Sequence, residues 1–157
     1  MIRFLHEGTR LYTHTTRAYR IFTNPKEIDK WHSAPYHIVF EKGGAFEITG
    51  EADGVTITSK GTRFVSYERE EQIILNWQDD YQFKDKAAKV EIRIFPATSE
   101  TEYCTEIHVV HNDLSELDEE MAKLYKTFWK NTLEHIRRSV NGDWVIQDSE
   151  LTLDCFK

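Results

Sequence analysis

Residues 18–31 read Ala-Tyr-Arg-Ile-Phe-Thr-Asn-Pro-Lys-Glu-Ile-Asp-Lys-Trp and predict two short helices that meet at a capped junction. The side chain of Asn24 can accept hydrogen bonds from the free backbone N–H groups at a helix start, and Pro25 suits the first helical position. Glu27, three residues after Asn24, can close a capping box. We therefore expect a new helix to begin at Asn24.

A longer helix is predicted near the other end of the chain, over residues 116–140. Ser115 can cap its start, and Asn141-Gly142 supplies a left-handed stop. At about 1.5 Å per residue this helix is roughly 37 Å long. Its apolar side chains recur at helical spacing, at Leu117, Met121, Leu124, Tyr125, Phe128, Trp129, Leu133, Ile136 and Val140.

Alternating apolar and polar residues between these helices predict half-buried antiparallel strands. Turn signals at Gly43-Gly44, Asp53-Gly54, Lys60-Gly61 and residues 98–101 separate them, as in a meander. The order of elements, a strand, two helices, a meander and a helix, predicts an α+β fold. The positions predicted to share inner faces are Phe46 and Ile48; Val55 and Ile57; Ile73, Leu75 and Trp77; Val90, Ile92 and Ile94; Tyr103, Thr105, Ile107, Val109 and His111.

Several motifs, taken in chain order, resemble the START-like superfamily, also called SRPBCC or helix-grip proteins. More narrowly, they are similar to the branch named after the activator of the ninety-kilodalton heat-shock-protein ATPase. The resemblance runs over roughly residues 9–140. The motifs are the helix junction with Tyr19, Phe22, Ile28 and Trp31, the strand opening Gly43-Gly44-Ala45-Phe46, the strand Ile73-Ile74-Leu75-Asn76-Trp77, the strand from Thr105 to His111, and the last-helix positions Trp129, Leu133 and Ile136.

This resemblance implies a curved antiparallel sheet of about six or seven strands wrapped around the C-terminal helix, with two short helices after the first strand. It also implies a cavity between sheet and helix. We expect one domain over residues 1–157, with a core of about residues 9–140 and a C-terminal extension at 141–157. That extension could cover the sheet or groove, add an edge strand or mediate self-association.

Composition argues against several classes of partner. A formal charge of −7 with scattered basic residues does not provide the clustered basic face that nucleic acids need. The N-terminus lacks the apolar run of a signal peptide, and no window approaches a membrane span, so we expect a cytoplasmic protein without membrane insertion. Cys104 and Cys155 lie far apart in different predicted elements, and we expect no disulfide framework.

Candidate chemistry is sparse. His108 and His111 point to opposite faces of their strand and cannot bind one ion, so we predict no metal site and no cofactor. Cys104 shares its strand face with Glu106, which disfavours a thiolate, and no serine elbow or phosphate loop appears. Asp79-Asp80 could supply paired acids, but we interpret them as a solvated strand end. We therefore predict no catalytic residues.

Aromatic side chains carry most of the functional information. The candidate ligand-binding residues, proposed to line a groove between sheet and long helix, are Trp31, Phe46, Phe64, Trp77, Tyr103, His111, Phe128 and Trp129. The alternative is a purely structural role, in which these rings fill the core and His111 is a structural histidine hydrogen-bonded to the backbone. The family often has Gly before the last-helix Trp, whereas Phe128 stands here, which could narrow a cavity or offer a stacking surface.

Our leading hypothesis is non-catalytic binding of a small hydrophobic or aromatic molecule between sheet and helix, oriented by His111 or Tyr103. The first alternative, which the resemblance implies, is a protein-interaction module that supports a chaperone. The second is a cyclase- or hydrolase-like enzyme, which would need an acid–base pair that faces the cavity, where the face analysis supplies His111 alone.

Overall fold

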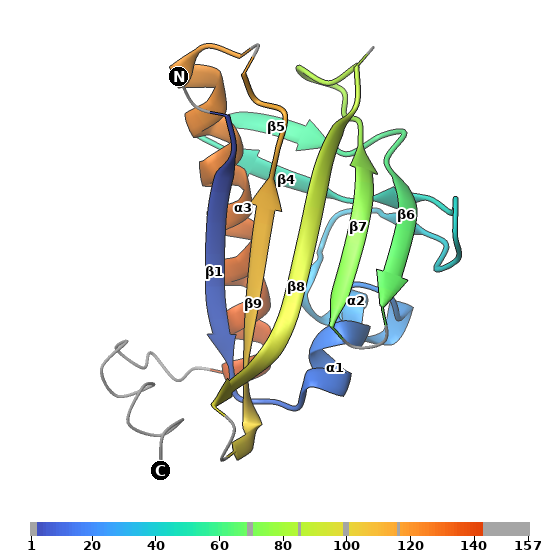
Figure 1. Ribbon diagram of the computed structural model, residues 1–157, viewed down its shortest axis with the longest axis vertical. Helices are drawn as coiled ribbons and strands as arrows, with labels where there is room; N and C mark the ends of the chain where they lie inside the picture. The colour runs from blue at the N-terminus through green and yellow to red at the C-terminus, as the bar shows by residue number, and fades with distance from the viewer. Residues whose placement is uncertain (1–2, 69–70, 85, 99–100, 116, 143–157) are drawn as a thin grey trace.

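A five-stranded antiparallel sheet lies across one side of the long C-terminal helix α3 (Figure 1). The computed structural model describes residues 3–68, 71–84, 86–98, 101–115 and 117–142. The strand order in the sheet is β1-β9-β8-β7-β6. The elements are β1 (Leu5–Leu11), α1 (Thr15–Arg20), α2 (Pro25–Trp31), β2 (His37–Ile38), β3 (Phe46–Glu47), β4 (Thr49–Ala52), β5 (Val55–Thr58), β6 (Arg63–Glu68), β7 (Gln72–Trp77), β8 (Ala88–Thr98), β9 (Thr101–His111) and α3 (Glu119–Asn141).

The predicted α+β helix-grip architecture is confirmed, but the strand count differs. Besides the main sheet there are two separate two-stranded ladders, β2-β3 and β4-β5. Ser59 accounts for part of this division. Its Oγ accepts from Ile48 N at 2.8 Å and donates to Phe46 O at 2.9 Å, so a side chain replaces ladder bonds where a longer strand would continue.

At the junction between α1 and α2, Asn24 caps α2 as predicted, but Glu27 does not make its predicted contact. The Asn24 side chain accepts from Lys26 N at 2.9 Å, and Pro25 occupies the first turn. The predicted capping box is wrong, because the backbone N–H of Asn24 donates to Arg20 O at 2.9 Å. Glu27 instead joins the two helices through Arg17, at 3.2 Å.

Helix α3 ends as predicted but begins later. Asp118, not Ser115, is its N-cap, and the Asp118 side chain accepts from Met121 N at 2.8 Å. Leu117 N already donates to Leu114 O, so the preceding segment forms a turn of its own. At the other end Gly142 has a φ of 69°, and its N–H donates to Arg138 O. Glycine adopts this left-handed stop without steric cost.

The predicted inner faces of the strands are confirmed for the described side chains, with Val55 half-buried and the others buried. Asp53 and Gly54 both have positive φ and form the tight turn between β4 and β5. One prediction about cysteine is wrong: Cys104, buried in β9, is disulfide-bonded. Residues 143–157 of the expected C-terminal extension lie outside the described residues.

Candidate ligand-binding site

A groove of about 480 Å³ opens between the end of α2, strand β4 and the second half of α3. One wall is the segment from Trp31 to Ala34, and a second is the backbone of Thr49 to Glu51. The third wall is one face of α3. Its residues fall at helical spacing: Asn131, Thr132, Glu134, His135 and Arg138.

Trp31 is the aromatic residue of this groove, and its ring is held in place. The indole Nε1 donates to Ile21 O at 3.0 Å, which ties the last turn of α2 to the end of α1. Phe22 packs edge-on against the indole, with ring centroids 6.3 Å apart. Trp31 is 9% exposed, so only a small part of its surface faces the groove.

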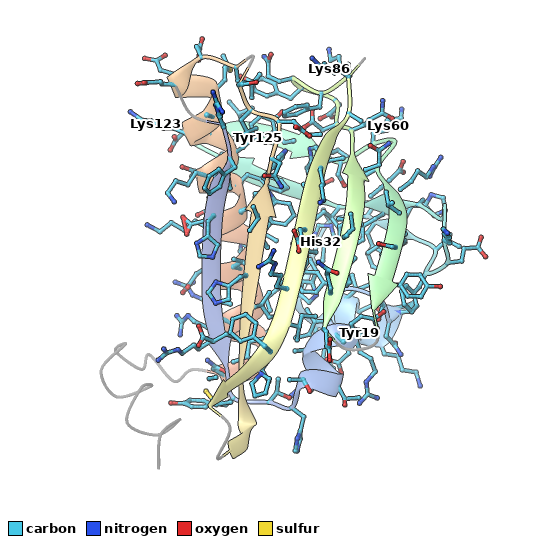
Figure 2. All side chains as sticks on the ribbon, viewed as in Figure 1. Tyr19, His32, Lys60, Lys86, Lys123 and Tyr125 are labelled. Atoms are coloured by element: carbon cyan, nitrogen blue, oxygen red, sulfur yellow. The ribbon has the colours of Figure 1, made fainter. Side chains whose placement is uncertain are left out.

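His32 follows Trp31 and is held by β4. Its Nε2 accepts from Thr49 N at 3.2 Å, so the neutral ring carries its proton on Nδ1. Burial and the neighbouring His135 lower the pKa of His32, which favours that neutral ring at pH 7. Figure 2 shows His32 near the middle of the molecule, whereas Tyr125 lies nearer its upper end. The groove therefore contains an oriented, uncharged imidazole.

The α3 wall is fixed by polar contacts. Asn131 Nδ2 donates to Glu51 O at 2.8 Å, which joins α3 to β4 across the groove. Glu134 binds the guanidinium groups of Arg137 and Arg138 and thereby balances part of their charge. The two arginines lower the pKa of Glu134, first through the hydrogen bond from Arg137.

Seven of the eight predicted ligand-binding residues are core residues, each no more than 9% exposed. Trp77, Phe128 and Trp129 form one cluster, with ring centroids 5.2 to 5.7 Å apart. Phe46 and Phe64 pack edge-on in another group, 5.6 Å apart. Tyr103 lies in β9, and its side chain is outside the described part of the structure. Of the predicted set, Trp31 alone lines the groove described above.

His111 is buried among aromatic rings, not at the mouth of a cavity. Trp129 Nε1 donates to His111 Nδ1 at 3.0 Å, so the partner is a side chain and not the backbone that we expected. Nε2 then carries the proton, and it has no hydrogen-bond partner. The rings of Trp77, Phe83 and Tyr125 have centroids 5.3 to 5.5 Å from His111. Complete burial lowers the pKa of His111 to about 3.

The interpretation of Asp79-Asp80 as a solvated strand end is wrong for Asp79, which is buried. It is 3% exposed and accepts four hydrogen bonds, two at each carboxylate oxygen. Oδ2 accepts from Trp77 Nε1 and Tyr125 OH, both at 2.8 Å. Oδ1 accepts from the backbone N–H groups of Tyr81 and Phe83. Burial and this carboxylate raise the pKa of Tyr125, and the network fixes the segment after β7 to α3.

Sequence reasoning missed the polar groove residues. Asn131, His135 and Arg138 recur at helical spacing on the polar side of α3, and that stripe was a usable signal. His32 and Thr49 could not be paired from sequence, because their contact depends on how α2 docks against β4. Among the described residues, no group of three or more His, Cys, Asp or Glu side chains is arranged to hold a metal ion.

The sheet, the long helix that it grips and the grooves at its rim define a START-like, helix-grip protein. A family model described as Activator of Hsp90 ATPase homolog 1-like protein matches residues 13–141, and this chain belongs to that family. No curated protein matches the chain. None of the described helices is long and apolar enough to cross a membrane.

Solved structures share this fold at low sequence identity. Protein MLL2253 from Mesorhizobium loti is 16% identical with a TM-score of 0.67, over 90% of this chain and 98% of that one. An HSP90 activator from Plasmodium falciparum is 14% identical with a TM-score of 0.66, over 90% and 97%. The Aha1 dimer from Colwellia psychrerythraea is 14% identical with a TM-score of 0.65, over 92% and 99%. These similarities establish the fold.

Proposed function

We propose that this protein binds a small apolar or aromatic molecule with a polar end, without covalent chemistry, in the groove between α2, β4 and α3. The observation that carries this proposal is the meeting of a fixed indole, Trp31, with an oriented imidazole, His32, in a groove of about 480 Å³. Apolar ligand surface buried there contributes about 25 cal/mol per Å². The Nδ1–H of His32 supplies a donor for the polar end.

The groove suits a ligand better than the interior between sheet and helix. Trp77, Phe128 and Trp129 are fully buried and in mutual ring contact, so a guest there would have to displace close-packed side chains. A ligand in the groove needs no such displacement. In this proposal Trp31 touches the ligand, and the ring of Phe128 packs behind Gly50 in the β4 wall of the groove.

The test is a titration of ¹⁵N-labelled protein with 1-anilinonaphthalene-8-sulfonate, a flat apolar probe with an anionic group. We expect shifts at the Trp31 indole N–H and at backbone amides of residues 49–51 and 131–138. Ala34→Trp should fill the groove and abolish binding. Thr56→Trp, on an exposed position of β5, is the matched control and should bind like the parent. Undiminished binding by Ala34→Trp would refute the proposal.

A chaperone-binding role is a second candidate, favoured by one apolar patch. Val39, Phe40, Val65 and Tyr67 are 39–44% exposed, and the rings of Phe40 and Tyr67 lie 4.5 Å apart. Exposed apolar patches of this kind commonly bind other proteins. The family description and the activator from Plasmodium falciparum suggest Hsp90 as the partner.

The ATPase rate of Hsp90 with added protein tests this second candidate. We expect Phe40→Ser with Tyr67→Ser to remove any stimulation by the parent. Phe95→Ser, at a comparably exposed position on β8, should retain it. No stimulation by the parent would exclude this role. We do not propose a cyclase- or hydrolase-like reaction, because His111 is held by Trp129 among aromatic rings.

A further inference from the structure

The outer face of the sheet, which points away from α3, carries two histidines from neighbouring strands. His6 in β1 and His108 in β9 lie on this face, two positions apart in register, since His108 is opposite Gly8. His6 is exposed and His108 is half-buried. Both strands face the viewer in Figure 1, with α3 behind them.

The two imidazoles meet edge to edge. His6 Nε2 lies 2.6 Å from His108 Nδ1, and the ring planes differ by 12°. The centroids are 4.8 Å apart, which equals this N···N distance plus about 1.1 Å from each nitrogen to its ring centre. The two nitrogens therefore point at each other almost in a common plane.

Glu106 fixes which nitrogen of His108 holds a proton. His108 Nε2 donates to Glu106 Oε1 at 2.9 Å, and Arg10 lies 3.6 Å from the other carboxylate oxygen. His108 Nδ1 must then be the acceptor and presents a lone pair to His6. A carboxylate that binds the far nitrogen of an imidazole is the usual outer-shell partner of a metal-bound histidine.

Gly8 provides the space for this arrangement. A Cβ atom at this position would lie 2.8 Å from His108 Nδ1 and 2.9 Å from Cε1, so any side chain would push the ring aside. Gly8 and His108 also line a groove of about 650 Å³ around the edge of β1, whose other wall is formed by Lys130, Leu133, Glu134 and Arg137 of α3. That groove leaves room for water or another small ligand beside His108.

We propose that His6 Nε2 and His108 Nδ1 form a two-imidazole site for a borderline transition-metal dication such as Zn²⁺. Imidazole nitrogen suits Zn²⁺, Cu²⁺ and Ni²⁺, whereas Mg²⁺ and Ca²⁺ prefer oxygen ligands. Tetrahedral Zn²⁺ with bonds of about 2.05 Å holds two nitrogens about 3.3 Å apart. The rings need to separate by less than about 1 Å from their present 2.6 Å, which the exposed His6 can supply.

The protonation state of His6 agrees with this proposal. Partial burial and then the neighbouring His108 lower the pKa of His6, which keeps its imidazole neutral at pH 7. Metal binding needs the neutral ring. When the metal binds Nε2, His6 takes the tautomer with its proton on Nδ1, and no net proton release is required. Two protein ligands leave the remaining positions of the metal to water or to a ligand in the adjacent groove.

The experiment is a calorimetric titration of the full chain with ZnSO₄ at pH 7.5, with ¹⁵N spectra of the imidazoles. We expect one Zn²⁺ per chain, with large shifts at His6 Nε2 and His108 Nδ1. His6→Gln and His108→Gln should each weaken binding about tenfold or more. Gly8→Val should also weaken it, although both imidazoles remain. His37→Gln removes another exposed histidine, which lies beside Glu47, and should leave the affinity unchanged.

Equal affinity in the parent and in His6→Gln would overturn the proposal. So would the same loss in His37→Gln as in His6→Gln, because that result describes adventitious binding to surface histidines. His6 is exposed, so its substitution does not threaten the fold. Neither His6 nor His108 lines the groove between α2, β4 and α3, so failure of this test and failure of the proposed ligand binding can be told apart.

Discussion

Gly50 in β4 and Phe128 in α3 compete for one volume, because a Cβ atom on Gly50 would lie 2.6 Å from Cε2 of the Phe128 ring. The ring fills the space that a side chain on β4 would occupy. The family resemblance implies glycine in α3 where Phe128 stands, and here the small residue is on the opposing strand. Of the two expectations for Phe128, a narrowed cavity and a stacking surface, the complete burial of this ring favours the first.

Gly50→Ala should destabilise the protein, because the new methyl group overlaps the Phe128 ring. Overpacking of this kind costs about 1–3 kcal/mol, measurable as a lower midpoint of urea unfolding. Phe128→Leu removes the overlapping ring atoms. Gly50→Ala should therefore cost less stability in the Phe128→Leu background than in the parent. An identical cost of Gly50→Ala in both backgrounds would contradict this relationship.

Asp79→Asn should lower the free energy of unfolding by about 2–4 kcal/mol. The carboxylate accepts from four donors, two at each oxygen. In asparagine an NH₂ group replaces one of these oxygens, and this donor then points at two other donor groups. Asp80→Asn is the matched control. Asp80 is exposed and accepts one bond, from Thr58 N, so its change should cost less than about 1 kcal/mol. Equal losses of unfolding free energy in the two variants would show that the buried hydrogen bonds of Asp79 contribute no more to stability than the exposed one of Asp80.

His111 should make the protein less stable as pH falls. The unfolded histidine has a pKa of about 6.5, whereas the folded one stays neutral until about pH 3. Below pH 6.5 the unfolded state therefore binds a proton at His111, whereas the folded state does not bind it until about pH 3. This residue then contributes a loss of up to about 1.4 kcal/mol per pH unit between these values. The ring protons of His111 in NMR spectra should not titrate above pH 5, and a midpoint near 6.5 would contradict the assignment.

Asn24→Ala should cost about 1 kcal/mol through loss of the cap on α2. The Asn24 side chain satisfies Lys26 N, which has no helical partner of its own. Asn24→Asp keeps an accepting oxygen and should stay close to the parent in thermal unfolding. If alanine and aspartate gave the same midpoint, this cap would contribute little.

Local signals were the part of this fold that could be predicted from sequence. Asn24 with Pro25 marks a helix start whatever lies around it, and Gly142 marks a stop for the same reason. The inner faces of the strands followed from alternation alone. The start of α3 was misplaced because Ser115 and Asp118 are both good caps, and packing of the preceding turn selects Asp118.

The contacts that build the candidate sites were beyond this reasoning because each joins distant segments. Asp79 was interpreted as solvated because nothing near it in sequence announces Tyr125, 46 residues away, as a donor. His108 was judged against His111 on its own strand, while its real neighbour is His6, 102 residues away. Register between strands, which decides such pairs, depends on the whole sheet.

The hydrogen bond from Trp31 Nε1 to Ile21 O has a consequence for selectivity. The only polar atom of the indole is already committed, so a guest meets carbon surface at this residue and no donor. Planar hydrocarbon rings therefore gain most from it, whereas sugars and other polyhydroxylated compounds gain little. In the proposed function, heteroatoms would be recognised by the imidazole at the neighbouring position and by the polar side chains of α3, so shape and polarity are sensed by different residues.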